Sequence, residues 1–360
     1  MKTAKRQLSA LAKAAFAVAL LAVLATAGPA SAQSAPQAPA GMIRVPAGSF
    51  TMGRDGGPAD EAPAHSVRLS AYWIDRHEVT VAQFAAFVRQ VEAWDQIEGN
   101  WLRYSVQGCV GLLGHLGKRY GWILRQQPPL AGAATVAMRR DRARWRAALA
   151  ALAAQLKVNV SELAGLSAAA VAKLPALAAL AAVQAQLPIR GISWRDAVAY
   201  ASHHGKRLPT EAEWERAARG TDGRPWPWGA TWQPKRCRVG EAAAAGPVAV
   251  GSKPDCVSAV GCLDMAGNLW EWVGDWYGDR AYGAPGEASA ADPAGPVGLA
   301  HGRLPQPVAS HQSPLRDPGQ GRETDTRKVI RGGGWAGAPG QARFNARTTR
   351  RLWSNPDYWH

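Results

Sequence analysis

The stretch 263–277 reads LDMAGNLWEWVGDWY and combines carboxylates with aromatic side chains. Asp264 and Glu271 flank an Ala-Gly-Asn sequence, whose residues tolerate a tight or left-handed backbone. Such a turn directs several backbone carbonyls to one point, and carbonyl and carboxylate oxygens together are the ligands that Ca²⁺ prefers. Tryptophans at 270, 272 and 276 alternate with the acids, which is also typical of a strand packed into a core. The residues alone leave both interpretations open.

The chain has four cysteines: Cys109, Cys237, Cys256 and Cys262. They form no Cys-x-x-Cys pair, and the histidines at 203 and 204 have no zinc-like spacing to any of them. An oxidising compartment would permit disulfides. We expect one structural disulfide among the last three cysteines and favour Cys237–Cys256, although a pairing cannot be deduced from spacing.

The first 32 residues are typical of a secretory signal peptide. A basic start precedes the apolar run 14–27, and Ala30-Ser31-Ala32 has the small-x-small form of a cleavage site. The apolar run is short for a membrane span, which needs about 20 residues. Residues 33–41 form a Pro/Ala linker. We therefore expect a periplasmic or secreted protein whose folded part is 42–360.

The formal net charge of +15 indicates acidic partners or, equally, an arginine-rich surface exposed to solvent. No nucleic-acid-binding motif accompanies it, so no nucleic-acid partner is predicted. The basic run 138–146 could place a helix on an anionic surface, but a solvated helix face explains it as well.

Local patterns predict several elements of the fold. Strands are expected on both sides of the Pro-Ala-Gly sequence at 46–48, over 67–75, over 188–194 and from 329 into a glycine turn. Thr80 is expected to cap one helix, and a second helix covers 194–204. Thr210 and Glu213 form a capping box for a third, so the acids at 211, 213 and 215 have structural rather than catalytic roles.

Residues 94–187 differ from the rest of the chain. The part 131–187 consists mostly of alanine and leucine with few turn signals, which predicts two or three helices. We interpret the whole segment as an inserted α-helical subdomain.

Five segments resemble, in order, the formylglycine-generating enzyme (sulfatase-modifying factor) family. They are Val45-Pro-Ala-Gly-Ser-Phe-Thr-Met-Gly53, Glu78-Val-Thr80, Gly205-Lys-Arg-Leu-Pro-Thr-Glu-Ala-Glu-Trp-Glu215, Asp264-Met-Ala-Gly-Asn-Leu-Trp-Glu-Trp272 and Arg331-Gly-Gly-Gly-Trp335. The resemblance covers about 42–93 and 188–357. It implies a single α+β domain of low regular secondary structure, related to C-type lectins, with 94–187 inserted.

The same resemblance implies one structural calcium site. Its ligands would be the carboxylates of Asp264 and Glu271 and the backbone carbonyls of Gly267 and Leu269. A first calcium site of the family falls on Arg238, where a cation would be unfavourable, so we expect that site to be lost.

The decisive departure concerns copper. The family's two copper-binding cysteines fall near Arg343 and Thr348, and no cysteine follows Cys262. Arginine and threonine cannot replace the soft thiolates that bind Cu(I), so copper is not expected. The resemblance therefore assigns no catalytic residue here.

Two functions follow from these residues. The first is an exported oxidative or maturation enzyme that does not use the copper–cysteine mechanism; the wider group includes pyoverdine-maturation proteins and accessory domains of ergothioneine synthases. The second is a non-catalytic, calcium-stabilised binding or assembly module. It would be a monomer that holds an exported protein, a peptide or an anionic small molecule. Its expected groove residues are Trp270, Trp335, Arg343, Arg347, Thr348 and Arg350.

Overall fold

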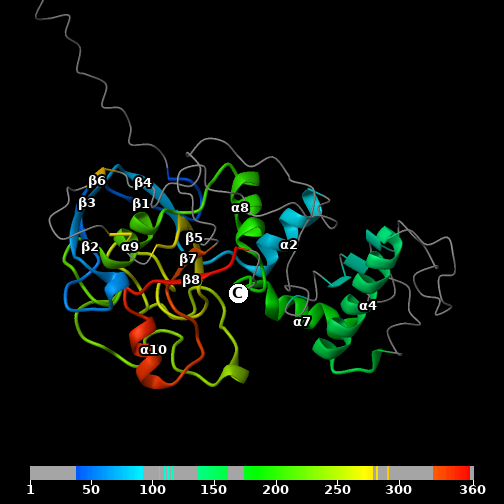
Figure 1. The fold of residues 1–360 in the computed structure, drawn as a ribbon. Coiled ribbons are helices and arrows are strands. Elements are labelled where there is room, and N and C mark those ends of the chain that lie inside the picture. Colours follow the sequence, from blue (N-terminus) through cyan, green and yellow to red (C-terminus); the bar gives the residue numbers. More distant parts are fainter. Residues whose placement is uncertain are drawn as a thin grey trace, which may run out of the picture. The chain divides into compact units, whose positions relative to one another are not determined.

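The computed structural model describes most of the chain after residue 37. The described residues are 38–91, 105, 109–110, 112–113, 115–116, 136–160, 174–278, 281–282, 290–291 and 327–356, with no side chains described for 136–142 and 290–291. The chain divides into two compact units, Met1–Ala40 and Gly41–His360, and the elements below belong to the second (Figure 1). The expected signal peptide lies outside the described residues. In the described part, no helix is long and apolar enough to cross a membrane.

The described strands form three small sheets. The first pairs β1 (Met42–Val45) antiparallel with β4 (Tyr72–Asp75). The second has the order β2 (Gly48–Met52), β3 (His65–Leu69) and β6 (Ala290–Ala291). The third has the antiparallel order β5 (Glu271–Trp276), β7 (Lys328–Arg331) and β8 (Leu352–Ser354). Mixed helices and small sheets, with little regular secondary structure, therefore characterise the fold.

Two strand predictions were wrong. The segment 67–75 is not one strand, because the chain leaves β3 after Leu69 and enters a different sheet at Tyr72. The alternation of apolar residues continues through the break, which hides it from a pattern count. The segment 188–194 contributes isolated bridge residues, Ile192 and Pro188 (the latter opposite Thr80), rather than a strand.

Three helices begin where the sequence predicts, each with a complete capping box. These are α2 (Val81–Gln90) after Thr80, α8 (Trp194–His203) after Ser193 and α9 (Glu211–Arg219) after Thr210. In each box the cap side chain accepts a hydrogen bond from the third helical N–H, and the third side chain accepts one from the cap N–H. A further helix, α10 (Pro339–Asn345), follows the glycine turn.

The alanine-rich segment contains the helices α4 (Val136–Leu156) and α7 (Pro175–Ala185). The basic run 138–146 lies within α4. A buried apolar cluster joins these helices to α2 and α8, with Phe84, Phe87, Trp145, Leu152 and Tyr200 among its members. Helices α4 and α7 thus share a core with α2 and α8.

Helix α9 is buried on every side, although five of its nine residues are ionisable. Two of its carboxylates, Glu211 and Glu215, meet arginines from the C-terminal part of the chain. Arg331 donates to Glu211 at 3.0 Å and to Glu215 at 2.6 Å, and Arg351 binds both oxygens of Glu211 at 2.8 Å. Arg331 and Arg351 are fully buried. The ion pairs compensate for burying these charges, which would otherwise be strongly unfavourable.

The helix acids therefore have structural roles, as predicted, but capping explains only part of those roles. Glu213 caps the helix and also binds the half-exposed Arg207 at 2.6 Å. Glu211 and Glu215 instead balance buried arginines more than a hundred residues away. No local pattern around 211–215 contains that information.

We predict that Arg331→Met destabilises the protein far more than Arg207→Met does. The first change leaves buried carboxylates short of a partner and should lower the free energy of unfolding by about 3–5 kcal/mol. The second removes a half-exposed ion pair, worth about 1 kcal/mol or less. Urea unfolding of both variants measures the difference. Equal losses would show that the buried pairing is not what stabilises α9.

Candidate functional site

The acidic turn at 264–271 has the left-handed backbone that its sequence predicts. Asp264, Gly267 and Asn268 have φ values of 59°, 82° and 58°. At Gly267 a β-carbon would lie 2.3 Å from the carbonyl oxygen of Arg238, so only glycine fits. The turn then leads directly into β5 at Glu271.

Each expected calcium-binding carboxylate uses one oxygen in a protein hydrogen bond. The Oδ2 of Asp264 accepts from the Gly251 N–H at 2.6 Å, and the Oε2 of Glu271 accepts from the Trp214 indole at 3.0 Å. A β-carbon on Gly332 would lie 3.5 Å from the other oxygen of Glu271 and 3.7 Å from the Leu269 carbonyl oxygen. The missing β-carbon therefore leaves space beside two of the four expected ligand atoms.

These donors fit calcium only as a mixed set. Among the described residues, no three His, Cys, Asp or Glu side chains could hold a metal ion together. A cation here would depend on backbone carbonyls as well as on Asp264 and Glu271. That mixture of oxygen donors is the one Ca²⁺ accepts.

Glu78 is a residue of this site that the sequence prediction missed. Its two carboxylate oxygens accept from the Leu269 N–H at 3.0 Å and from the Asn268 amide at 2.8 Å. Burial, together with the charges of Glu271 and Asp264, raises the pKa of Glu78 well above its ordinary value. In the sequence, Glu78 belongs to the Glu78-Val-Thr80 segment, which carries the family resemblance but suggested no chemical role for the residue.

The same surroundings affect the two expected ligands. Burial raises the pKa of Glu271 to about 7, with a smaller contribution from Asp264. Burial also raises the pKa of Asp264, against the hydrogen bond from Gly251 and the nearby His77. Burial thus disfavours the charged form of these acids, and a bound cation would favour it again by lowering their pKa values.

Arg238 is bound by its own surroundings. Its guanidinium donates to the carbonyl of Gly246 at 3.0 Å and to that of Ala245 at 3.3 Å, and it pairs with Glu241 at 3.1 Å. The first calcium site was expected to be lost because Arg238 stands at its position. The guanidinium of Arg238 does carry its positive charge to the nearby oxygens of Ala245, Gly246 and Glu241.

The six expected groove residues belong to two neighbouring places in the structure: the contact between the acidic turn and the glycines after β7, and the segment at the end of α10. Trp270 lies against Gly334, where a β-carbon would be 3.4 Å from its ring, and the backbone N–H of Trp335 donates to Asn268 at 3.0 Å. The other four belong to the end of α10 and the turn after it. The two places approach each other at Gly333, where a β-carbon would lie 3.0 Å from the carbonyl oxygen of Asn345.

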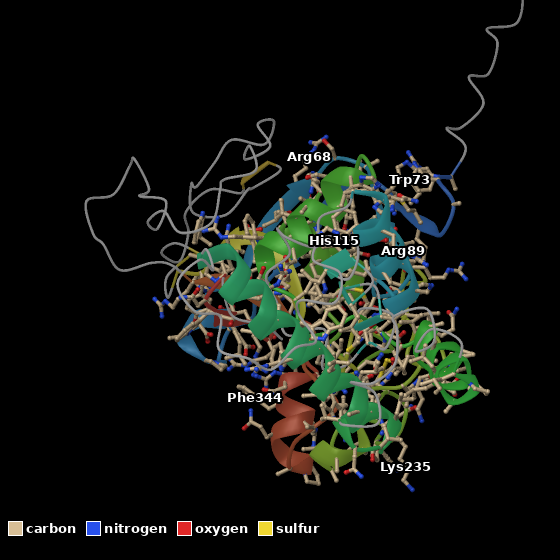
Figure 2. All side chains as sticks on the ribbon, turned by 90° about the vertical axis from the view of Figure 1, so that its right-hand side faces the viewer. Arg68, Trp73, Arg89, His115, Lys235 and Phe344 are labelled. Atoms are coloured by element: carbon tan, nitrogen blue, oxygen red, sulfur yellow. A yellow bond between two sulfur atoms is a disulfide. The ribbon has the colours of Figure 1, made fainter. Side chains whose placement is uncertain are left out.

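The three groove arginines have different partners. Arg343 is exposed and stacks over Trp226, with 5.3 Å between its guanidinium carbon and the ring centroid. Arg347 and Arg350 both lie over Phe344, which Figure 2 shows on α10. Both also pair with carboxylates of the loop before β3: Arg347 with Glu61 at 3.1 Å, and Arg350 with Asp60 at 3.4 Å. Their charges are therefore largely balanced.

Thr348 is fully buried, and its hydroxyl donates to the Arg224 carbonyl at 2.9 Å. It lies under the surface and fastens the segment after α10 to the loop that carries Trp226. Thr349 similarly donates to Glu61 at 2.7 Å.

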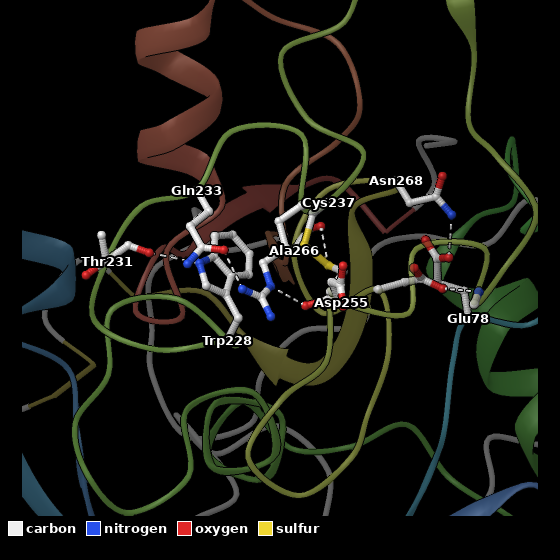
Figure 3. Close-up of a disulfide and its surroundings, with 12 residues drawn as sticks. Glu78, Trp228, Thr231, Gln233, Cys237, Asp255, Ala266 and Asn268 are labelled. Carbon is white, nitrogen blue, oxygen red and sulfur yellow. Dashed lines mark hydrogen bonds between the residues drawn. A yellow bond between two sulfur atoms is a disulfide. The ribbon is translucent and has the colours of Figure 1, made fainter.

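The cysteines have the expected pairing. Cys237 and Cys256 form a disulfide beside Ala266 (Figure 3), and Cys109 and Cys262 are free and buried. The free thiols belong to different apolar clusters, Cys109 to the helical one and Cys262 to the one around β5 and β7. Burial raises the pKa of each to about 12. All four cysteines are described, so the chain has no pair of free thiols that meets.

Comparison with known proteins settles the family. The model of the sulfatase-modifying factor enzyme 1-like domain matches residues 28–358. The chain belongs to this family. A formylglycine-generating enzyme of Thermomonospora curvata is 32% identical over 276 residues, which is 71% of this chain and 78% of that protein.

Other relatives extend over more of the chain. A mouse protein named inactive C-alpha-formylglycine-generating enzyme 2 is 28% identical over 333 residues, 88% of this chain and 81% of that protein. Among solved structures, PvdO from Pseudomonas aeruginosa is 20% identical, with a TM-score of 0.48 over 88% of this chain and 89% of that one. This family therefore contains both formylglycine-generating enzymes and a relative named inactive.

We predict that neither free thiol reacts in the native protein. Burial and the raised pKa values leave almost no accessible thiolate at neutral pH. A colorimetric thiol reagent should detect none in buffer and two per chain in denaturant without reductant. Rapid reaction of one thiol in buffer would contradict this arrangement.

Proposed function

We propose that this chain is an exported family member that does not use copper–thiolate oxidation and acts as a calcium-stabilised binding module. The observation that carries the proposal is the placement of the cysteines. Two are joined in a disulfide, and the remaining two are buried in separate clusters. The soft thiolates that favour Cu(I) would have to converge on one point, and the four cysteines, all of them described, provide no such pair.

The positions where the resemblance places the copper ligands support the same conclusion. Arg343 is exposed and carries a positive charge against Trp226, while Thr348 is buried and bonded to a backbone carbonyl. Neither has a sulfur atom, and a guanidinium would repel a metal cation. A copper centre does not fit these residues.

Calcium does fit the acidic turn. Asp264 and Glu271 would supply carboxylate oxygens, and Gly267 and Leu269 would supply carbonyls. Glu78 fixes the turn through its hydrogen bonds with Leu269 and Asn268. The ion would hold the turn between α9 and β5 and would supply no reactive group of its own.

The ligand surface would comprise Trp270, Trp335 and Arg343. Arg343 is the groove arginine for which the described residues supply no carboxylate partner. A peptide carboxylate or another anionic group could bind its guanidinium while apolar parts rest on the tryptophans. Arg347 and Arg350, already paired with Glu61 and Asp60, would shape this surface more than bind the ligand.

The relative named inactive supports a binding role, whereas the relatives named formylglycine-generating enzymes support an enzyme. The alternative is an oxidative or maturation enzyme that uses other chemistry. Metal analysis and oxygen uptake of the purified protein separate the two. A stoichiometric redox metal, or oxygen uptake that depends on a candidate substrate, would establish the enzyme and overturn the binding module.

We predict that chelation lowers the melting temperature and that Glu271→Ala removes this response. At calcium 100-fold above its Kd, loss of the ion should cost roughly 5–10 °C. Differential scanning calorimetry with calcium and with a chelator measures the shift. Asp222→Asn, which changes an exposed ion pair with Arg224, is the matched control and should respond like the unaltered protein. Identical melts in calcium and chelator would mean that the turn is held by packing alone.

A further inference from the structure

The disulfide closes a loop, 237–256, that contacts the acidic turn at several points. Its two cysteines are 19 residues apart, and both are buried. From one end of the loop, the Arg238 carbonyl accepts from the Asn268 N–H at 2.9 Å. From the middle, Val248 makes two bonds with the Asn268 side chain, at 2.9 and 3.2 Å. Asn268 is thereby fixed by the loop on one side and by Glu78 on the other.

The far end of the loop reaches the carboxylate itself. The Gly251 N–H donates to Asp264 at 2.6 Å, and the Cys256 sulfur lies 3.5 Å from the Ala266 carbonyl oxygen. Gly267 packs directly on the backbone of Arg238. The loop therefore contacts four of the five residues from Asp264 to Asn268, including one expected calcium ligand through its side chain and another through its backbone.

Other segments also hold the turn: Glu78 binds Asn268 and Leu269, and the Gly267 N–H donates to the Gly332 carbonyl at 2.9 Å. Asp264 and Asn268 have left-handed backbone conformations, which non-glycine residues adopt only when their surroundings impose them. The loop binds both of these residues, Asp264 through Gly251 and Asn268 through Arg238 and Val248, and the disulfide restricts the loop by joining its ends. A cation site gains affinity when its ligands are held in place before binding.

We propose that the Cys237–Cys256 disulfide sets the calcium affinity of the acidic turn, so that the oxidised chain binds calcium and the reduced chain binds it weakly. The inference rests on the calcium site of the proposed function. Reduction by a dithiol transfers two electrons and two protons, gives the thiols of Cys237 and Cys256, and converts the dithiol to its own disulfide. The freed loop then no longer fixes Asp264 and Asn268.

Linkage makes the coupling reciprocal. If the disulfide strengthens calcium binding, bound calcium must stabilise the disulfide by the same factor. Both sulfurs are buried, so a reductant reaches them only after the loop opens. Calcium that holds the turn against the loop should therefore slow reduction.

The first test compares calcium binding by isothermal titration calorimetry in the unaltered protein and in the double variant Cys237→Ala/Cys256→Ala. We expect the Kd for calcium to be at least tenfold higher in the double variant. Cys109→Ala removes a buried thiol in the helical cluster and keeps the disulfide, so its Kd should be unchanged. Equal Kd values in all three proteins would overturn this inference and leave the calcium site standing. No calcium binding by the unaltered protein would overturn both.

A second measurement needs no variant that must fold without the disulfide. The unaltered protein is reduced with dithiothreitol in calcium, in magnesium and in chelator, and the new thiols are alkylated and counted by mass spectrometry. We expect calcium to slow reduction at least tenfold and magnesium to have little effect. In Glu271→Ala the protection by calcium should disappear. The same rate in calcium and in chelator would overturn the inference.

Discussion

The pairing of Glu211 and Glu215 with Arg331 and Arg351 is the interaction on which the rest of the fold depends. It allows a charged helix, α9, to occupy a fully buried position, and it connects α9 to β7 and to the segment before β8. A fold with three small sheets has few long hydrogen-bond ladders to hold its parts together. Buried ion pairs with good geometry take over that task, and each depends strongly on its partner.

The acidic turn is positioned by the same elements. Trp214 of α9 donates to Glu271, and Gly332, directly after Arg331, leaves the space beside Glu271 and Leu269. The ion pairs that bury α9 therefore also set the distance between the turn and the glycine sequence that follows β7. The acidic turn and the segment after α10 lie on different parts of the chain, so one can be kept while the other changes.

Sequence could predict what depends on neighbours in the chain. The Thr210–Glu213 capping box, the cap at Thr80, the left-handed turn and the glycines after β7 were predicted, because each involves residues a few positions apart. The pairing of Glu211 and Glu215 with Arg331 and Arg351 could not be predicted, because these arginines lie 116 to 140 residues away. Glu78, 190 residues before Asn268, was missed for the same reason. The break between β3 and β4 escaped because both strands continue one alternating pattern.

The long separation in the α9 pairs also affects how the chain can be made. Arg331 and Arg351 follow Glu211 by 120 and 140 residues. During synthesis, Glu215 can pair with Arg219 of its own helix, but Glu211 and the second oxygen of Glu215 lack their arginine partners until Arg331 and Arg351 have been made. Burying these carboxylates earlier would be strongly unfavourable, so α9 has to remain hydrated in the nascent chain. The buried position of α9 is therefore completed only after β7 and the segment before β8 have been synthesised.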